Sequence, residues 1–283
     1  MSNIIDKNIL ICPCCQSSRL VENVRNFQCG SCKKKYPKVK NKYYFFKLKT
    51  SRQTDALDKA KSLLKKYWRL YDFSINLFSP VCPSMDLRKF IKKYIEKKKI
   101  IALNIGSGNS DLSRRISNID IFPYNNVDLT CDIENIPIKD NSVDAIINVA
   151  VLEHVINPEK AIKEMRRILK KGGVIFSFFP FIQPFHASPN DYSRRTFEGT
   201  KLFYGDFKTI EIKNAGGPTS GLLWVLQEWI ATAFSFGIKP IYQILAIVIM
   251  FLTFPVKFLD ILFRHYPMAK NISSGFVYIG RKK

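Results

Sequence analysis

The chain has 283 residues, of which 46% are hydrophobic and 13% are aromatic. This composition excludes a disordered chain, and the length allows one α/β domain with a small accessory module. The formal net charge of +22 favours contact with nucleic acid or an anionic membrane surface, and the alternative explanation of the charge is a genome-wide compositional bias, since the chain is rich in lysine, asparagine and isoleucine together. The N-terminal residues lack the basic-then-apolar pattern of a signal peptide, so we expect a cytoplasmic protein.

Differences in composition and apolar patterning divide the chain into three parts. Residues 1–46 hold five of the seven cysteines and are expected to form a small module. Residues 47–98 have apolar residues near helical spacing and are expected to form a helical linker. Residues 99–283 are expected to form the main domain, in which residues 217–268 are strongly apolar.

The cysteines of the first part fall into two CxxC pairs. Cys12 and Cys15 form the first pair, and Cys29 and Cys32 form the second, with thirteen residues between the pairs. Four thiolates at this spacing suit a tetrahedral, structural zinc ion, and a reducing compartment is then the simpler assumption. A redox pair or unrelated core cysteines are the alternatives, and Cys14 is left over.

A resemblance supports the zinc interpretation. The segment from ILICPCC through CGSCKKKYPKVKNKYYFF resembles the Trm112-like zinc ribbons, in which the second CxxC is followed by a Tyr-Pro, here Tyr36-Pro37. The resemblance implies that the ribbon supports a methyltransferase, as a partner or as a fused domain, and does no chemistry itself.

A buried strand is predicted over residues 100–105, and it runs directly into Gly106-Ser107-Gly108. Glycines at the turn after a strand let the backbone approach a ligand closely. By itself this motif also fits a nucleotide-phosphate site or a plain tight turn.

Two carboxylates end the next predicted strands. Asp120 ends the second apolar stretch, where it is placed to accept hydrogen bonds from both hydroxyls of a ribose. Asp132, followed by Ile133, ends the third stretch and suits an adenine amino group.

Strands and a helix alternate in the following region. Strands are predicted over residues 143–149 and 174–179, and a helix between them runs from residue 158 to residue 169 and stops at Gly172-Gly173. This alternation is typical of a parallel sheet built from βαβ units.

This series of strands, glycine turn and carboxylates, taken in chain order, resembles class I methyltransferases of the type 11 group. The resemblance covers roughly residues 100–215 and the last strand. The motifs that carry the resemblance are Ile136-Pro137-Ile138, Asp140-Asn141-Ser142-Val143-Asp144, Leu152-Glu153-His154, and Glu164-Met165-Arg166-Arg167-Ile168-Leu169-Lys170-Lys171-Gly172-Gly173. It implies a Rossmann-like α/β fold with a seven-stranded sheet, and S-adenosylmethionine as cofactor. The residues that it assigns to the cofactor are Asn104, Gly106, Gly108, Asp120, Asp132 and Ile133.

The chain departs from this pattern at two points. The family usually has an acidic residue where this chain has Asn104, and an amide loses the charge attraction for the methionine amino group. The span from Gly106 to Asp120 is short, so the first helix must be stunted. Both departures leave open a non-catalytic protein that retains the fold. The resemblance gives His154 a structural role.

The loop of residues 180–196 is expected to overhang the transferred methyl group, because ligands of such sheets sit outside the carboxyl ends of the strands. We predict His186 and Asp191 as catalytic residues that orient and deprotonate an acceptor hydroxyl. Asp191 also suits a turn, and Thr196 is predicted to cap a helix over residues 197–204. The loop resembles those of methyltransferases of surface-glycan or glycolipid assembly.

The apolar insertion is predicted to form two helices that are broken at residues 237–240. Between Pro240 and Pro255 lie only fourteen residues, fewer than the about twenty that cross hydrocarbon. The cations that flank the insertion are Lys239, Lys257, Arg264 and Lys270.

The strands on either side of the insertion bear on its placement. They are expected near residues 207–213 and 274–280 and to pair with each other, so a single span would separate two paired strands. We therefore expect an interfacial or re-entrant helical pair, with a buried cap or a dimer interface as the alternatives.

Together these patterns predict a methyltransferase that acts on a hydroxyl of a glycan, a lipid-linked sugar or another membrane-proximal acceptor. The protein is expected to be cytoplasmic and peripheral on the cytoplasmic face of a membrane. The net charge and the ribbon leave an RNA methyltransferase as the alternative, although no RNA-binding signature is present.

Overall fold

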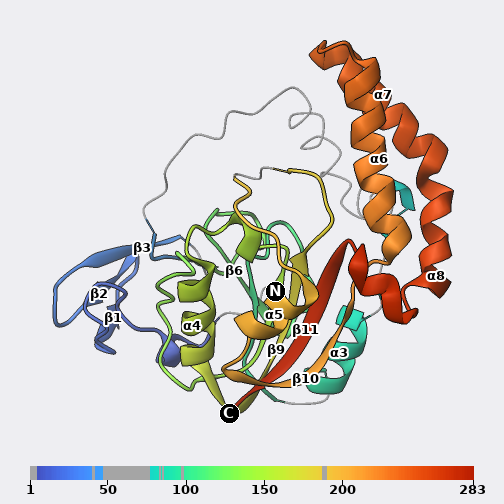
Figure 1. Ribbon diagram of the computed structural model, residues 1–283. Helices are drawn as coiled ribbons and strands as arrows, with labels where there is room; N and C mark the ends of the chain where they lie inside the picture. Colours follow the sequence, from blue (N-terminus) through green and yellow to red (C-terminus); the bar gives the residue numbers. More distant parts are fainter. Residues whose placement is uncertain are drawn as a thin grey trace.

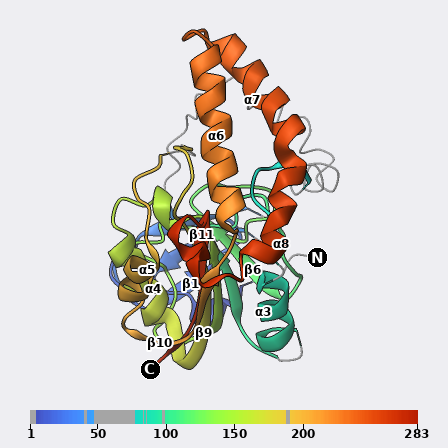
Figure 2. The same cartoon turned by 45° about the vertical axis from the view of Figure 1, so that its right-hand side comes forward.

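The computed structural model describes residues 5–39, 42–46, 77–82, 84, 86–96, 99–186 and 190–283. An α/β body carries a small β module on one side, and a pair of helices projects from one end of the body (Figures 1 and 2). Most of the predicted helical linker lies outside the described residues.

The described strands form one eleven-stranded mixed sheet, so the expected total of seven strands is wrong. Seven strands come from residues 99–283, and the N-terminal module adds four because its last strand pairs in parallel with β7. From one edge to the other the strands are β1 (Leu20–Glu22), β2 (Asn26–Cys29), β3 (Lys35–Val39), β4 (Lys42–Tyr44), β7 (Leu129–Thr130), β6 (Ile116–Asp120), β5 (Ala102–Ile105), β8 (Val143–Val149), β9 (Leu169–Pro180), β11 (Gly275–Lys282) and β10 (Phe207–Asn214).

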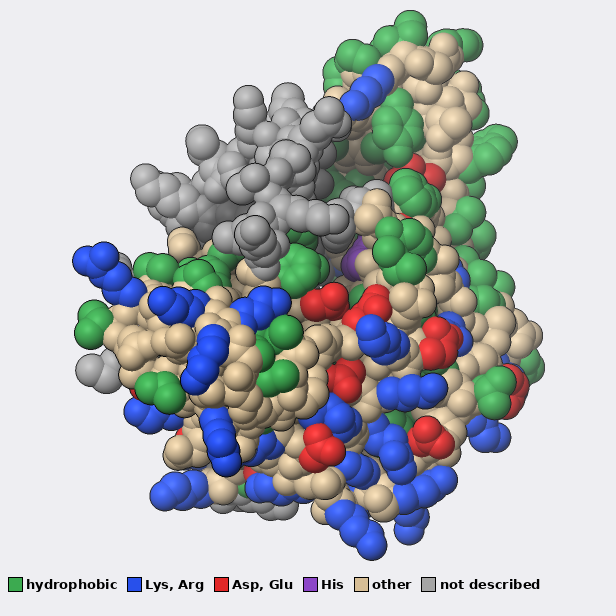
Figure 3. Space-filling view, turned by 90° about the vertical axis from the view of Figure 1, so that its left-hand side faces the viewer, with side chains coloured by type: hydrophobic (Ala, Val, Ile, Leu, Met, Phe, Trp, Pro, Cys, Tyr) green, Lys and Arg blue, Asp and Glu red, His purple; other side chains and the backbone are tan. Residues whose placement is uncertain are grey.

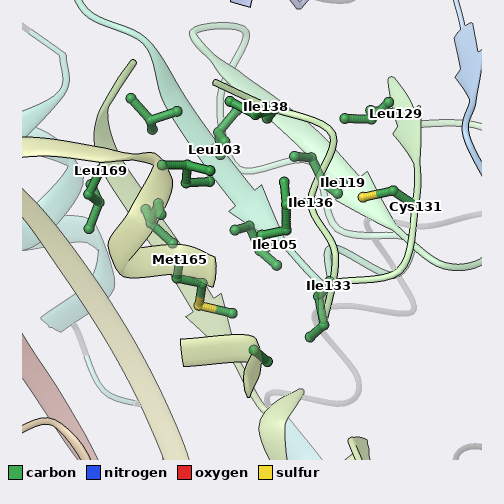
Figure 4. Close-up of a cluster of buried hydrophobic side chains, with 14 of the residues drawn as sticks. Leu103, Ile105, Ile119, Leu129, Cys131, Ile133, Ile136, Ile138, Met165 and Leu169 are labelled. Atoms are coloured by element: carbon green, nitrogen blue, oxygen red, sulfur yellow. The ribbon is translucent and has the colours of Figure 1, made fainter. Parts of the chain in front are cut away.

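The central strands are buried on both faces, which is why they read as continuous apolar runs in the sequence. Side chains alternate between two cores. Leu103 of β5 and Ile146 of β8 belong to the core beneath α4 (Pro158–Ile168), which Figure 4 shows, whereas Ala102 and Ile147 face α3 (Asp86–Tyr94). The sheet is therefore covered by helices on both faces.

The connections around the first strands are short. The fully described stretch 106–115 forms turns and no helix, as the short span predicts. The helix α4 ends at Ile168 rather than at the glycine pair, because the chain turns into β9 at Leu169. Gly172 then adopts a φ of +78° within this strand. The helix α5 (Phe197–Phe203) begins as predicted, with the Thr196 side chain accepting a hydrogen bond from the Gly199 backbone N–H.

The N-terminal module docks on the body through its backbone. The N–H of Ile11 donates to the Pro137 carbonyl at 3.0 Å, and the N–H of Lys139 donates to the Ile9 carbonyl at 2.8 Å. Phe45 N–H donates to the Thr130 carbonyl at 2.9 Å. Because these bonds fix the register of the two parts, the module is an extension of the sheet.

The apolar insertion forms two long helices, α6 (Pro218–Phe234) and α7 (Lys239–Thr253), which we call the helical hairpin. The hairpin projects beyond the body in both ribbon views (Figures 1 and 2). The chain returns through a 3-10 helix, η4 (Phe254–Leu259), and α8 (Asp260–Phe263), then η5 (Pro267–Asn271). Strands β10 and β11 pair antiparallel on either side of it, as predicted.

The length argument against a membrane span is wrong. Helical structure continues through Pro255, which is accommodated in the first turn of η4, and the run Lys239–Phe263 of 25 residues is long and apolar enough to cross a membrane by length and composition alone. Its last part, however, is anchored to the body. Lys257 is fully buried and donates to the Ser79 carbonyl at 2.7 Å.

The base of the hairpin is also anchored by a carboxylate. Asp260 is fully buried and accepts hydrogen bonds from the backbone N–H groups of Gly217, Thr219 and Ser220 at 3.0, 2.9 and 2.7 Å. Asp260 thus supplies the negative charge that the first turn of α6 favours. A side chain at Gly217 would meet this carboxylate at 2.2 Å, so the position requires glycine.

Candidate functional site

The turn after β5 holds the predicted cofactor glycines. Gly106 and Gly108 have φ values of +72° and +53°, and the N–H of Gly106 donates to the Ile119 carbonyl at 2.8 Å. A side chain at Gly106 would collide with Val151 at 2.2 Å, whereas nothing lies within 4 Å of the position that a Cβ on Gly108 would take. The second glycine therefore borders open space, where a ligand can approach the backbone.

Asp120 lies beside this turn at the carboxyl end of β6. One of its carboxylate oxygens accepts from the Gly108 N–H at 2.8 Å, and the other accepts from the Phe122 N–H at 2.9 Å. The structure thus brings together the glycine turn and the predicted ribose carboxylate.

The other predicted cofactor residues surround this pair. Asn104 is buried, and its amide donates to the Asn118 side chain at 3.1 Å. Asp132 follows β7 and forms a turn with the Glu134 N–H at 2.9 Å, and Ile133 is buried next to it. Because β7, β6 and β5 are neighbours in the sheet, these residues lie along one edge.

The loop after β8 covers the glycine turn through Val151 and continues into η3 (Leu152–His154). Glu153 is fully buried, and neither of its carboxylate oxygens has a hydrogen-bond partner among the described residues. Burial raises the pKa of this carboxyl to about 7. The His154 ring contacts the Asn190 carbonyl through Nδ1, and burial lowers its pKa.

The predicted catalytic pair, His186 and Asp191, lies together in the loop after β9. The Asp191 carboxylate accepts from the backbone N–H of His186 at 3.0 Å and is paired with Arg194. Burial opposes ionisation of Asp191, but the hydrogen bonds from Arg194 and His186 outweigh it and lower its pKa. Asp191 therefore holds the loop in shape. Ala187 to Pro189 lie outside the described residues.

The His186 ring faces two neighbours. It stands edge-on to the His154 ring with centroids 5.5 Å apart, and it stacks on the Trp224 ring at 5.6 Å. Trp224 belongs to α6, so the loop after β9 contacts the base of the hairpin.

The four predicted zinc ligands converge in the N-terminal module. The sulfur atoms of Cys12, Cys15, Cys29 and Cys32 all lie within 4.8 Å of one another. The residues after each pair, Gln16 and Lys33, have left-handed backbone conformations, and their N–H groups donate to the carbonyls of the first cysteines of their pairs at 2.8 and 3.0 Å.

These paired turns bring four soft ligands to one point, as structural zinc requires. The Tyr36 hydroxyl lies 3.0 Å from the Cys12 sulfur, which provides an outer contact for that ligand. The zinc assignment stays a prediction that the geometry fits.

Sequence reasoning missed Glu153 and Trp224 as site residues. A Glu-His pair after one strand and a histidine after the next strand would have indicated the cluster, because the carboxyl ends of neighbouring parallel strands meet. Trp224 had no comparable signal, since its contact depends on where the hairpin leaves the body.

The strand order and the glycine turn define a Rossmann-like α/β domain with its binding edge at the carboxyl ends of β5 to β8. Residues 87–177 match the family model described as a methyltransferase domain. This part of the chain is therefore similar to a methyltransferase domain, and the prediction of such a domain is confirmed.

Two curated relatives match part of the chain. An uncharacterized 37.1 kDa protein from a transposon of Streptomyces fradiae is 31% identical over 91 residues, which are 32% of this chain and 26% of that protein. An uncharacterized protein of Methanocaldococcus jannaschii is 31% identical over 100 residues, 31% of this chain and 44% of its own. The chain thus spans less than half the length of either relative.

Two solved structures illustrate the structural similarity. The complex of the Haloferax volcanii Trm112 methyltransferase activator with a methyltransferase aligns with a TM-score of 0.47 and 12% identity, over 82% of this chain and 99% of that one. Phosphoethanolamine N-methyltransferase 2 of Haemonchus contortus aligns with a TM-score of 0.47 and 16% identity, over 84% of this chain and 61% of that one. Both scores are below 0.5, so the assignment rests on the family match.

Proposed function

We propose that the protein transfers a methyl group from S-adenosylmethionine to a hydroxyl of a lipid-linked acceptor, a glycolipid or lipid-linked sugar, at the cytoplasmic face of a membrane. The products are a methyl ether, S-adenosylhomocysteine and a proton. The observation that carries the proposal is the position of the helical hairpin, which begins at the same end of the body as the binding edge.

The strand directions fix this position. β10 and β9 each pair antiparallel with β11, so β10 runs parallel to β9, and its carboxyl end lies at the edge that also holds the glycine turn. The hairpin starts four residues after β10, at Pro218. An acceptor held against the hairpin is therefore close to the loops that surround the cofactor site.

The surface of the hairpin is apolar, unlike the rest of the molecule. Trp229, Phe236 and Leu252 are 63%, 83% and 74% exposed. Figure 3 shows hydrophobic side chains gathered over the projecting part, whereas many lysine and arginine side chains, with aspartate, glutamate and some hydrophobic side chains among them, are scattered over the visible face of the body. The expectation of a buried cap is not compatible with this exposure. A continuous apolar surface of this kind is typical of a protein or membrane contact.

The polar groups of the hairpin face each other, which favours a membrane over a protein partner. The Gln227 amide donates to the Thr253 hydroxyl at 2.6 Å, and the Tyr242 hydroxyl donates to Glu228. Pairing polar groups between the helices removes the cost of placing them in an apolar surrounding.

The charges indicate how the hairpin lies. Lys239 is exposed at the far end of the hairpin, and a lysine at the centre of a bilayer costs about 3 kcal/mol on insertion scales. We therefore place the hairpin along the interface, where Lys239 reaches the headgroups. Lys257, which the sequence suggested as a second contact to lipid, is buried instead.

The residues of the binding edge have defined parts in this proposal. Asp120 accepts from the ribose hydroxyls, Asp132 and Ile133 lie at the adenine, and the backbone at Gly108 faces the ligand. The bound sulfonium supplies an activated methyl group. His186 faces the acceptor, and Asp191 holds the loop that carries it.

The acceptor is tested by incubating the purified full chain with labelled S-adenosylmethionine and separated cell fractions: lipid extract, soluble glycans and RNA. We expect label in the lipid extract, at a site that resists mild base, as an ether does. A variant with Trp229→Ser and Phe236→Ser should methylate lipid less but bind S-adenosylmethionine with unchanged affinity.

The matched control removes two exposed apolar side chains from the body, with Ile156→Ser and Leu202→Ser, which are 70% and 83% exposed in the parent protein. It should behave as the parent does. Label in RNA alone would support the nucleic-acid alternative, and absence of S-adenosylmethionine binding would show a non-catalytic protein; either result overturns the proposal.

A further inference from the structure

The buried carboxylate of Glu153 has no hydrogen-bond partner among the described residues. Buried carboxylates are normally paired with a cation or hydrogen-bonded, because burying an isolated charge is costly. The carboxylate oxygens therefore have lone pairs left to bind a positively charged group.

Two histidine side chains lie close to the Glu153 carboxylate and complete a cluster of three possible metal ligands. One ligand atom from each of Glu153, His154 and His186 lies within 4.8 Å of the others, and Nε2 of His154 is 3.8 Å from the Glu153 carboxylate. Ligand atoms that share one transition-metal ion at about 2.0–2.2 Å from it lie at most about 4.4 Å apart. Small side-chain rotations therefore bring the three ligand atoms within coordination distance of one ion. Both histidines are only partly buried, which leaves one side of the cluster accessible.

The outer contacts of the histidines resemble those of metal ligands. Nδ1 of His186 lies 3.0 Å from the Pro184 carbonyl, and Nδ1 of His154 contacts the Asn190 carbonyl. A proton on Nδ1 of His154 leaves the lone pair on Nε2, which is how backbone carbonyls commonly orient metal-binding imidazoles. Nδ1 of His186 lies near both the Pro184 carbonyl, which accepts, and the Arg194 guanidinium at 3.2 Å, which only donates, so metal binding at Nε2 selects the tautomer that donates to Pro184. Arg194 donates to the same Pro184 carbonyl at 3.2 Å and pairs with Asp191, so the loop is held in place.

We propose that Glu153, His154 and His186 form a binding site for one divalent transition-metal ion, such as Zn²⁺, Mn²⁺ or Fe²⁺. Two imidazoles and one carboxylate on one side of an ion leave coordination positions open, and imidazole disfavours Mg²⁺ and Ca²⁺. The open positions accept the acceptor hydroxyl, whose pKa falls on coordination, and its proton passes to water. This role rests on the proposed function, but the metal site itself does not.

The site is tested on the full chain by loading one equivalent of zinc, which the four thiolates bind first, and then adding Mn²⁺, which prefers nitrogen and oxygen ligands to thiolates. Electron paramagnetic resonance should show one bound Mn²⁺ per chain, and Mn²⁺ should raise the melting temperature. Glu153→Gln and His186→Ala should each bind at least tenfold more weakly. His265→Ala, which removes the third histidine of the chain, should bind as the parent does.

Two outcomes overturn the proposal. Either the parent chain binds no Mn²⁺, or Glu153→Gln and His186→Ala bind it as tightly as His265→Ala does. Glu153→Gln also relieves the buried charge, so its melting temperature without metal should not fall, which separates lost binding from lost folding. Calorimetry with S-adenosylmethionine on the same samples separates the two proposals, since intact cofactor binding without Mn²⁺ binding rejects the metal site alone.

Discussion

The N-terminal module and the helical hairpin are both additions to the methyltransferase domain, but they are attached in opposite ways. The module continues the sheet through β4 and β7, and its Phe27, Tyr36, Tyr43 and Phe45 side chains are buried in the main core. Among the described residues, the hairpin contacts the body at its base, where Phe78 packs on Phe251 and Phe254, and many of its apolar side chains are exposed. The apolar surface of the module is thus covered within the described part of the chain, whereas much of the apolar surface of the hairpin is not.

The largest effect is expected in the N-terminal module. Cys29→Ser removes one of four sulfur ligands, and structural zinc contributes about 10–16 kcal/mol to the folding of isolated zinc fingers. Metal analysis should find about one zinc per chain in the parent and little in the variant, and hydrogen exchange should accelerate in β1 to β4.

Cys14→Ser is the matched control, because Cys14 is exposed and outside the cluster. It should retain the zinc. Full zinc in Cys29→Ser would remove the basis for regarding the module as metal-stabilised.

The second-largest effect on stability is expected at the base of the hairpin. Asp260→Ala leaves three backbone N–H groups at the start of α6 without their acceptor, and losing hydrogen bonds to a charged group costs about 1.5–3 kcal/mol. Urea unfolding should show this loss in the free energy of unfolding, and limited proteolysis should cut the hairpin faster.

The same substitution at the exposed Asp206 should change the free energy of unfolding by less than about 0.5 kcal/mol. If Asp260→Ala is equally harmless, the hairpin is not held at its base as described, and its position relative to the binding edge loses its support.

The domain that carries the two additions is expected to show the smallest effect on stability and a selective effect on cofactor binding. Asp120→Ala should weaken S-adenosylmethionine binding at least about tenfold by calorimetry, because a charge-assisted contact to the ribose is lost. Asp206→Ala should leave the affinity unchanged. Unchanged affinity in Asp120→Ala would mean that the carboxyl end of β6 does not contact the cofactor.

The sequence predicted the parts of the fold whose signals are local. β8 was expected over residues 143–149, where it is found, because a strand buried on both faces is an unbroken apolar run. The cap at Thr196 was likewise identified from one residue type ahead of a helix. The convergence of the four cysteines follows from spacing within a hairpin.

The parts that could not be predicted depend on contacts between distant segments. No residue near Tyr43 indicates that its strand pairs with Leu129, so the extension of the sheet was missed. Helical structure through Pro255 was missed because proline normally interrupts a helix, and here it falls where α7 passes into a 3-10 helix. The approach of Glu153 and His186 to within 4.8 Å of each other requires the neighbouring positions of β8 and β9.

The central claim, that the hairpin holds the binding edge at a membrane surface, is tested most directly by flotation with anionic liposomes at low and high salt. The apolar surface contributes about 25 cal/mol for each Å² buried and does not depend on salt, so the parent should float and remain partly bound in high salt. The variant with Trp229→Ser and Phe236→Ser should be released by salt, and the variant with Ile156→Ser and Leu202→Ser should not. No flotation of the parent at any salt concentration, or its complete release by salt, would contradict the account.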